Sequence, residues 1–208
     1  MHIGIMKICA LMFAFLLYLP QYAQAHSLAA DTKSLMSCPM KLTFNTPAET
    51  QEWRALNDGV MGGRSSGAPS FEGGHMIFKG TINTNGGGFS SVRRSIDVGA
   101  MADMAGMNMR VRSDGRLYKL SLRTDASFNG RSIAFQAPIK AAKPGEWETV
   151  FVSFDDIKSS IFGRPVNGAT FKPAAVNIVG IILADGQDGP FQLEVAWMEG
   201  CKNGDIAP

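Results

Sequence analysis

Apolar and polar residues alternate along several short stretches of this chain, with a period of two. Residues 107–112, 118–123 and 191–197 each place apolar side chains at every second position, with mostly polar ones between them. Such alternation is typical of strands in an antiparallel sheet that covers a core with one face. Further strands are predicted at 41–44, 75–80, 88–93, 131–136, 147–154 and 177–183.

The stretch 177–183 is a nearly continuous apolar run, so we expect it to be a central strand that is covered on both faces. Helical patterning is confined to one short segment, with Thr46 as the expected N-cap, Pro47 at the first helical position and an end near Trp53. Many short strands without a linker or an internal repeat indicate a single all-β domain, either a sandwich or a jelly roll.

The first 25 residues have the features of a signal peptide. Lys7 supplies a positive charge, residues 8–19 are an apolar run too short to span a bilayer, and residues 23–25 read Ala-Gln-Ala, which fits a cleavage site. The mature protein is therefore expected to be exported, periplasmic or secreted, with no transmembrane segment; an uncleaved anchor is the alternative. The predicted organisation is a signal peptide at 1–25, a flexible arm at 26–40, a β-sandwich domain at 41–202 and a tail at 203–208.

The net charge and the cysteines limit the possible partners and the cellular compartment. The net charge is +2, and removal of Lys7 lowers it by one, so nothing in the composition attracts nucleic acid or anionic lipid in general. Cys9 leaves with the signal peptide, whereas Cys38 and Cys201 remain near the two ends of the domain. An oxidising compartment favours a disulfide between them, worth roughly 4–5 kcal/mol for so long a loop. That bond requires the first and last strands to be neighbours.

The segment from Trp53 to Gly67 reads W-R-A-L-N-D-G-V-M-G-G-R-S-S-G, and its glycines predict a shaped loop rather than a regular element. Gly63-Arg64-Ser65 superficially resembles the end of a phosphate-binding loop. Asp58 stands where that motif needs its first glycine, arginine replaces lysine, and no strand–loop–helix context is present, so we reject a nucleotide site here. The glycines at 86–88 do not complete a dinucleotide fingerprint either.

Catalytic and metal chemistry have little support in the sequence. His75 stands at a strand start without a nucleophile motif to serve, and Asp155-Asp156 is expected to be a solvated turn because adjacent side chains diverge. One sharper hypothesis is that cleavage exposes His26, whose amine and imidazole would bind copper together with His75. The prediction is no catalytic residue, no metal and no cofactor, with a copper-dependent exported enzyme as the third-ranked alternative.

The three tryptophans raise the question of carbohydrate binding, because flat aromatic faces stack on sugar rings. Trp197 continues the apolar face of 191–197 and is expected in the core. Trp147 opens a strand and is expected to be half-buried beneath a loop, and Trp53 is expected to pack under the glycine loop. Packing therefore explains at least two of the three.

Several segments, in order from about residue 41 to 200, resemble the complex I intermediate-associated protein 30 family. The matching pieces are Trp53; Asn57-Asp58-Gly59-Val60-Met61-Gly62-Gly63 with Ser65; Gly87-Gly88-Phe89 with Ser91, Val92 and Arg93; Asp114-Gly115 with Tyr118, Leu120 and Arg123; Trp147; Phe154; Gly163-Arg164; and Asp188-Gly189-Pro190-Phe191 with Leu193. Ser153 and Gly186 depart from the residues that family members commonly have there. The D-G-V-M-G-G segment is the most specific of these pieces.

The resemblance implies a galactose-binding-domain-like β-sandwich, with no known catalytic chemistry. It also implies an assembly-factor role, because the mitochondrial member of the family assists assembly of respiratory NADH:ubiquinone oxidoreductase in the matrix. For an exported, bacterial-type member we expect chaperone-like binding of a protein client in the cell envelope. The alternative is a module that binds carbohydrate or another small polar ligand, an inference from fold alone.

The polar residues shared with the family are the candidates for ligand or partner binding, since a fold does not need them for burial. One hypothesis is that Asp58 pairs with an arginine to lock the glycine loop while the remaining residues face a ligand; the other is that all of them brace loops. The candidate set is Asn57, Asp58, Gly62, Gly63, Ser65, Arg93, Arg123 and Arg164.

Overall fold

The structure is a computed structural model, and it describes residues 38–202. The predicted signal peptide, most of the predicted arm and the tail lie outside the described residues. Met40 already belongs to the first strand, because it pairs with Gly200, so the predicted arm extends too far by at least this residue. Among the described residues, no helix has both the length and the apolar character that a membrane span requires.

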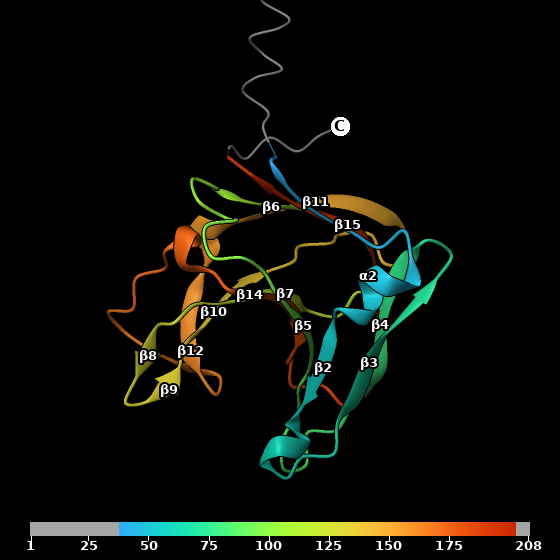
Figure 1. Cartoon of the computed structure of the whole chain (residues 1–208). Helices are drawn as coiled ribbons and strands as arrows, with labels where there is room; N and C mark the ends of the chain where they lie inside the picture. Colours follow the sequence, from blue (N-terminus) through green and yellow to red (C-terminus); the bar gives the residue numbers. More distant parts are fainter. Residues whose placement is uncertain (1–37, 203–208) are drawn as a thin grey trace, which may run out of the picture. The chain divides into compact units, whose positions relative to one another are not determined.

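One layer of the domain is a six-stranded antiparallel sheet, drawn across the top and right of Figure 1. Its strand order is β11-β6-β15-β4-β3, and β1 pairs with the far part of the long strand β15. This sheet will be called the outer sheet. Its strands are β1 (Met40–Thr43), β3 (Ser66–Glu72), β4 (His75–Ile82), β6 (Gly106–Ser113), β11 (Trp147–Ser153) and β15 (Gly189–Cys201).

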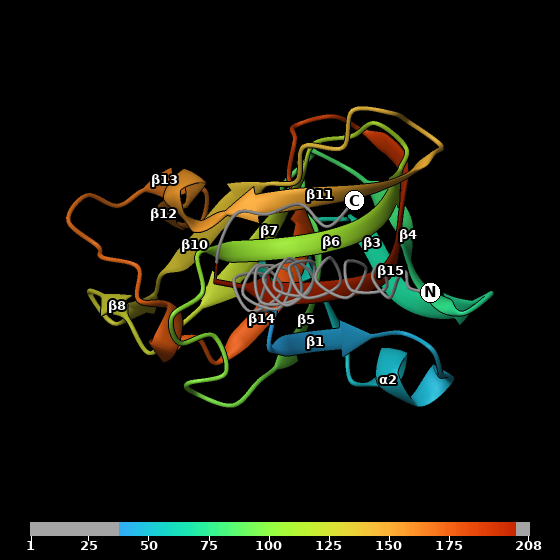
Figure 2. The same cartoon turned by 90° about the horizontal axis from the view of Figure 1, so that it is seen from above.

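The second layer is a seven-stranded antiparallel sheet with the order β13-β12-β10-β7-β14-β5-β2, which we call the inner sheet. Figure 2 shows strands of the outer sheet lying above β10, β7, β14 and β5. A separate hairpin, β8 (Ser127–Phe128) and β9 (Arg131–Ser132), stands beside this sheet in Figure 1. The seven strands are β2 (Arg54–Asn57), β5 (Ser90–Ser95), β7 (Tyr118–Arg123), β10 (Ala134–Pro138), β12 (Lys158–Ile161), β13 (Arg164–Pro165) and β14 (Ile178–Leu183).

The core lies between the two sheets, because alternate side chains of each strand point into it. Outer-sheet residues such as Met109 and Leu193 and inner-sheet residues such as Leu120 and Ile181 are fully buried there. Phe78, Phe191 and Tyr118 form an edge-on aromatic cluster at one place in this layer. The core residues are Met40, Leu42, Phe44, Trp53, Met76, Phe78, Ile82, Val92, Met101, Met104, Met107, Met109, Val111, Tyr118, Leu120, Leu122, Ile133, Phe135, Ala137, Ile139, Val150, Val152, Phe154, Val176, Val179, Ile181, Leu183, Phe191, Leu193, Val195 and Met198.

The predicted strands largely occur where expected, and β14 is central in the inner sheet as predicted for 177–183. The expectation that it is covered on both faces is wrong, because Val179 and Ile181 face the core whereas Ile182 lines a groove on the opposite face. The short helix α2 (Pro47–Gln51) also forms, with Thr46 and Glu49 in a reciprocal capping box. Three short 3₁₀ turns connect strands: η1 (Asp58–Met61), η2 (Phe154–Asp156) and η3 (Pro173–Ala175).

Two other expectations from the strand pattern are wrong. The segment 53–67 is not all loop, because residues 54–57 form β2 against β5 and β3 begins at Ser66. The run 131–136 is split between β9 and β10, and the intervening Ile133 is buried, with its N–H bonded to the carbonyl of Ala126. The local alternation of apolar and polar residues does not reveal where the chain leaves one strand partner and begins to pair with another.

A disulfide joins Cys38 and Cys201, which are 163 positions apart in the sequence. The two cysteines lie beside the β1–β15 pair, in which Met40 is opposite Gly200. The first and last described strands are thus neighbours, as the sequence required for this bond. The chain is covalently closed at one edge of the sandwich.

Candidate functional site

A groove of about 870 Å³ runs along the inner sheet on the face that is turned away from the core. Its lining residues on β7, β10 and β14, among them Lys119, Gln136 and Ile182, alternate with the core residues of the same strands. In Figure 1 the β12 side of this sheet and the β2–η1 side stand apart, with β10, β7, β14 and β5 between them. The sandwich thus presents one hollow sheet face to solvent.

Exposed apolar side chains stand at the two ends of this groove. Val60 and Met61 on η1 are 70% and 49% exposed, and Phe162, after β12, is 66% exposed. Leu56 and Phe89 add half-buried apolar surface next to η1. Exposed apolar side chains that gather around a concavity are typical of a binding site rather than of ordinary surface.

The charged residues of the groove are mostly basic. Lys140 forms an ion pair with the lining carboxylate, Asp156, at 2.7 Å, and both side chains are largely solvated. Among the described residues, the other basic lining side chains form no ion pair: Arg93, Lys119, Arg123 and Lys158. A negatively charged ligand therefore fits the groove better than a positively charged one.

Arg93 and Arg123 are half-buried and close enough to affect each other. Burial lowers the pKa of Arg93 to about 10, and the positive charge of Arg123 contributes to that shift. Burial likewise lowers the pKa of Arg123. The Arg93 guanidinium stays charged at neutral pH, since its pKa remains well above 7.

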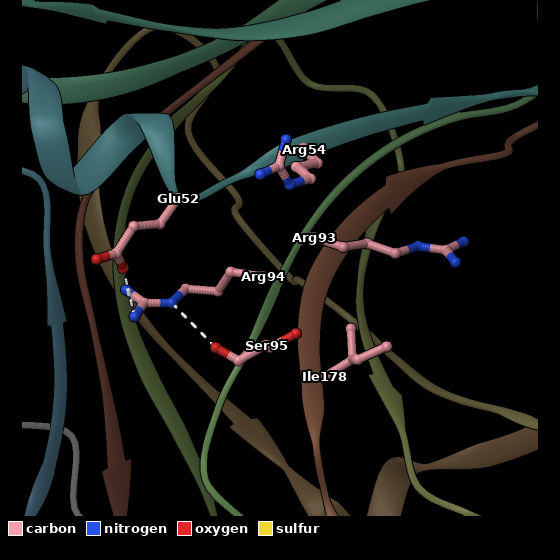
Figure 3. Close-up of a pocket in the computed structure, with 6 residues that line it drawn as sticks. All are labelled: Glu52, Arg54, Arg93, Arg94, Ser95 and Ile178. Carbon is pink, nitrogen blue, oxygen red and sulfur yellow. Dashed lines mark hydrogen bonds and ion pairs between the residues drawn. The ribbon is translucent and has the colours of Figure 1, made fainter.

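A smaller hollow of about 400 Å³ adjoins the groove at the β2–β5 edge (Figure 3). There Arg94 forms an ion pair with Glu52 at 2.5 Å, and its Nε donates to the carbonyl of Ser95. Figure 3 shows Arg93 directed away from that pair, on the side of Ile178. The neighbouring arginines therefore differ, because Arg94 is neutralised within the protein and Arg93 is not.

Asp58 lies beneath one end of the groove, and its side chain is fully buried. Its Oδ1 accepts a hydrogen bond from the Ser65 N–H (2.9 Å), and its Oδ2 accepts from the Ser65 hydroxyl (2.6 Å) and the N–H groups of Gly88 (2.6 Å) and Phe89 (3.3 Å). Burial alone would raise the pKa of Asp58, but these hydrogen bonds outweigh burial and hold the pKa below its usual value. The carboxylate ties the η1 loop to the loop before β5.

Two glycines allow the backbone to close around this carboxylate. A Cβ on Gly63 or on Gly87 would lie far inside van der Waals contact with the carboxyl group of Asp58, whereas Gly59 has open space around it. Close approach is a role that only glycine can fill at such positions. The unusual D-G-V-M-G-G segment is thus explained by a buried carboxylate and the chain wrapped around it.

The structure divides the predicted candidate residues into two groups. Asp58 and Ser65 form the carboxylate brace with Gly63, and Asn57 bridges the Gly67 carbonyl and the Ser90 hydroxyl. Gly62 ends η1 in the left-handed conformation. Arg93 and Arg123 line the groove, and Arg164 is exposed on β13 beside it.

The hypothesis that Asp58 pairs with an arginine is wrong, because among residues 38–202 it makes no ion pair and its partners are N–H and hydroxyl groups. The sequence could not reveal this, since backbone donors have no signature in it. Sequence reasoning also missed groove residues on strands and on η1. The alternation along β7 predicted that Lys119 points away from the core. Only the fold shows that this polar face of the sheet forms a groove. The missed residues are Val60, Met61, Lys119, Gln136, Lys158 and Phe162.

The other chemical candidates lie elsewhere. His75 is on the outer sheet, with its Nε2 2.7 Å from a Glu194 oxygen and its ring edge-on to Trp147. The expectation that Trp197 is in the core is wrong, because a bulge after Val195 shifts the register and leaves Trp197 half-buried. His26 lies outside the described residues, and within them no cluster of three metal-ligating side chains occurs.

Comparisons with known proteins bear on this geometry. The sequence model of a family described as "Complex I intermediate-associated protein 30 (CIA30)" matches residues 42–195. No curated protein matches the chain at a significant level. The chain is similar in structure to a family 11 carbohydrate-binding module of the cellulosomal cellulase Lic26A-Cel5E of Clostridium thermocellum, with a TM-score of 0.58 at 12% identity over 79% of this chain and 96% of that one.

A second solved structure is the family 11 module from Clostridium thermocellum in complex with a beta-1,3-1,4-mixed-linked tetrasaccharide. The TM-score is 0.55 at 14% identity, over 76% of this chain and 94% of that one. Identities this low establish the fold alone. The predicted galactose-binding-like β-sandwich is confirmed.

Proposed function

The chain belongs to the complex I intermediate-associated protein 30 family, and on that premise we propose that it is a non-catalytic module that holds an extended segment of a protein client in the groove. The client is a subunit of a membrane complex that is being assembled in the cell envelope. An exported location is part of the proposal, and the Cys38–Cys201 disulfide supports it, because such bonds persist in oxidising compartments.

The observation that carries this proposal is the make-up of the groove. Its ends carry the exposed side chains of Val60, Met61 and Phe162, and its floor carries unpaired basic groups. A peptide segment offers apolar side chains for the ends and hydrogen-bonding groups along its backbone for the floor. A flexible methionine at the entrance suits a site that accepts more than one sequence.

Carbohydrate binding is the second candidate, and the similarity to carbohydrate-binding modules favours it. Among residues 38–202, however, no tryptophan or tyrosine lines the groove to serve as a flat platform for a sugar ring. Trp53 is buried in the core, and Trp147 and Trp197 are on the outer sheet. Within the described part of the chain, the aromatic lining residues are Phe89 and Phe162, so we rank carbohydrate below a peptide.

Site-specific photo-crosslinking tests the proposal. Phe162, at the groove, and Val98, in the loop after β5 and outside the groove lining, are both exposed apolar residues, so each can be replaced by p-benzoylphenylalanine with a similar local effect. In envelope extract we expect one protein to be crosslinked from position 162 and not from position 98, and excess unlabelled protein to compete. Equal crosslinking from both positions contradicts the proposal. Glycan-array binding that is lost in Phe162→Ala, without a protein crosslink, would move the assignment to carbohydrate.

A further inference from the structure

Arg93 and Arg123 come from the two strands that flank the central strand of the groove floor. Arg93 on β5 is opposite Gly180 of β14, and Arg123 on β7 is opposite Ile178, two positions away on the same face. Strand spacing and rise place their Cα atoms roughly 12 Å apart across β14, within the combined reach of two arginine side chains. A Cβ on Gly180 would lie 2.9 Å from Cγ of Arg93, so glycine provides the space in which this side chain lies.

The hydrogen-bonding capacity of these guanidiniums is largely unused. Nε of each is buried without a hydrogen-bond partner. Arg123 donates from Nη1 to the carbonyl and hydroxyl oxygens of Ser132, while Arg93 has no hydrogen bond or ion pair among the described residues. Two like charges, half-buried and without a counter-ion, cost stability, and such an arrangement is typical of a site that receives an anion.

We propose that Arg93 and Arg123 form a carboxylate-binding subsite in the groove, and that it holds an aspartate or glutamate side chain of the bound segment. That the carboxylate belongs to a peptide segment rests on the proposed function. That the subsite binds a carboxylate does not. Planar guanidinium edges match a planar carboxylate, and charge-assisted bonds of this kind are among the stronger ones. Apolar lining beside the pair, including Leu56 and Ile182, fits an acidic residue flanked by apolar ones.

The first experiment tests the carboxylate chemistry without any client. The full chain, labelled with ¹⁵N-arginine, is titrated with glutarate and with its diamide while the Nε–Hε resonances are followed by NMR. We expect the Arg93 and Arg123 resonances to shift saturably with glutarate only. Arg93→Gln and Arg123→Gln, each checked for folding by circular dichroism, should weaken glutarate binding roughly ten- to a hundredfold, as for loss of a charged hydrogen bond. Lys79→Gln, an exposed change of equal charge on β4, should leave binding unchanged.

A second experiment distinguishes this inference from the proposed function. Extended peptides with one glutamate between apolar residues are compared with their glutamine counterparts and with oligogalacturonate, on wild type, Arg93→Gln and Phe162→Ala. Preference for the glutamate peptide that is lost in Arg93→Gln supports the subsite. Equal binding of both peptides, abolished by Phe162→Ala, keeps the proposed function and refutes the subsite. If glutarate and oligogalacturonate bind but no peptide does, the subsite binds carboxylates, and the proposal that the carboxylate comes from a peptide is refuted. Unshifted Nε resonances refute the subsite outright.

Discussion

Replacement of Asp58 by asparagine should destabilise the domain strongly, although it changes a single atom. The amide keeps the shape of the side chain, and its oxygen can take the place of Oδ2, which accepts from the Ser65 hydroxyl, Gly88 and Phe89. The amide NH₂ then faces the Ser65 N–H, a donor that bonds Oδ1 in the wild type. Two donors thus meet in a fully buried site.

The magnitude follows from these bonds. One buried donor left without a partner costs about 1–3 kcal/mol. The three bonds that remain lose the assistance of a full negative charge, about 0.5–1 kcal/mol each. Asp58→Asn should therefore lower the free energy of unfolding by about 2.5–6 kcal/mol, a large part of the stability of an ordinary domain.

Urea unfolding at pH 7, followed by tryptophan fluorescence, measures this loss, and hydrogen exchange at Ser65 and Gly88 locates it. Asp125→Asn is the matched control, because Asp125 is exposed and should change stability by less than about 0.5 kcal/mol. A variant within 1 kcal/mol of wild type, with unchanged protection of both amides, would refute the brace.

The pH dependence gives a second check with a definite sign. The pKa of Asp58 is lower in the folded protein than in the unfolded chain, so the carboxylate contributes its full stabilisation above the unfolded value of about 3.9. That contribution is lost as the pH falls through the lowered folded-state pKa. The gap between wild type and Asp58→Asn should thus narrow below about pH 4, and a constant gap would contradict the assignment.

Three further changes test the interactions that stabilise the domain around the groove. Gly87→Ala should cost about 1–3 kcal/mol because its Cβ would collide with Asp58, whereas Gly59→Ala should be nearly neutral in the same urea titration. Reduction of the disulfide should remove up to about 5 kcal/mol, seen as a lower melting temperature in calorimetry, and no shift would contradict the chain-entropy argument. Arg116→Met should lower the free energy of unfolding in urea by about 3–5 kcal/mol. The reason is that the fully buried carboxylate of Asp185 loses its two hydrogen bonds from the guanidinium, at 2.9 and 2.7 Å. An unchanged free energy of unfolding would show that water replaces these bonds.

The strands were predictable because alternation reports directly which side of a strand faces a core. β6 and β7 were located almost to the residue for this reason. The same rule failed at Trp197, since a bulge inserts one residue and exchanges the faces of the strand beyond it. A single-residue irregularity has no signal in the pattern of apolar positions.

The candidate site was predictable only in part, because the sequence does not separate residues that brace the fold from residues that bind a ligand. Residues that brace the fold and residues that bind a ligand are alike in composition, and what separates them is burial and partners. Asp58 and Arg93 were equally good candidates by sequence, yet one is satisfied by backbone donors and the other has no partner among the described residues. The exposed Phe162 and Val60 were missed because the hollow they border depends on the course of seven strands.

The position of β15 has a consequence for how the chain acquires its fold. This strand pairs with β1, β4 and β6, so the outer sheet cannot be joined until residues near Cys201 are available. Hairpins such as β3–β4 form from local sequence alone, but they remain separate pieces with an exposed apolar side until then. A chain that emerges from its N-terminus therefore stays open to aggregation and proteolysis at least until β15 has been made. The pairing of β15 then closes the outer sheet, and the disulfide holds its first and last described strands together.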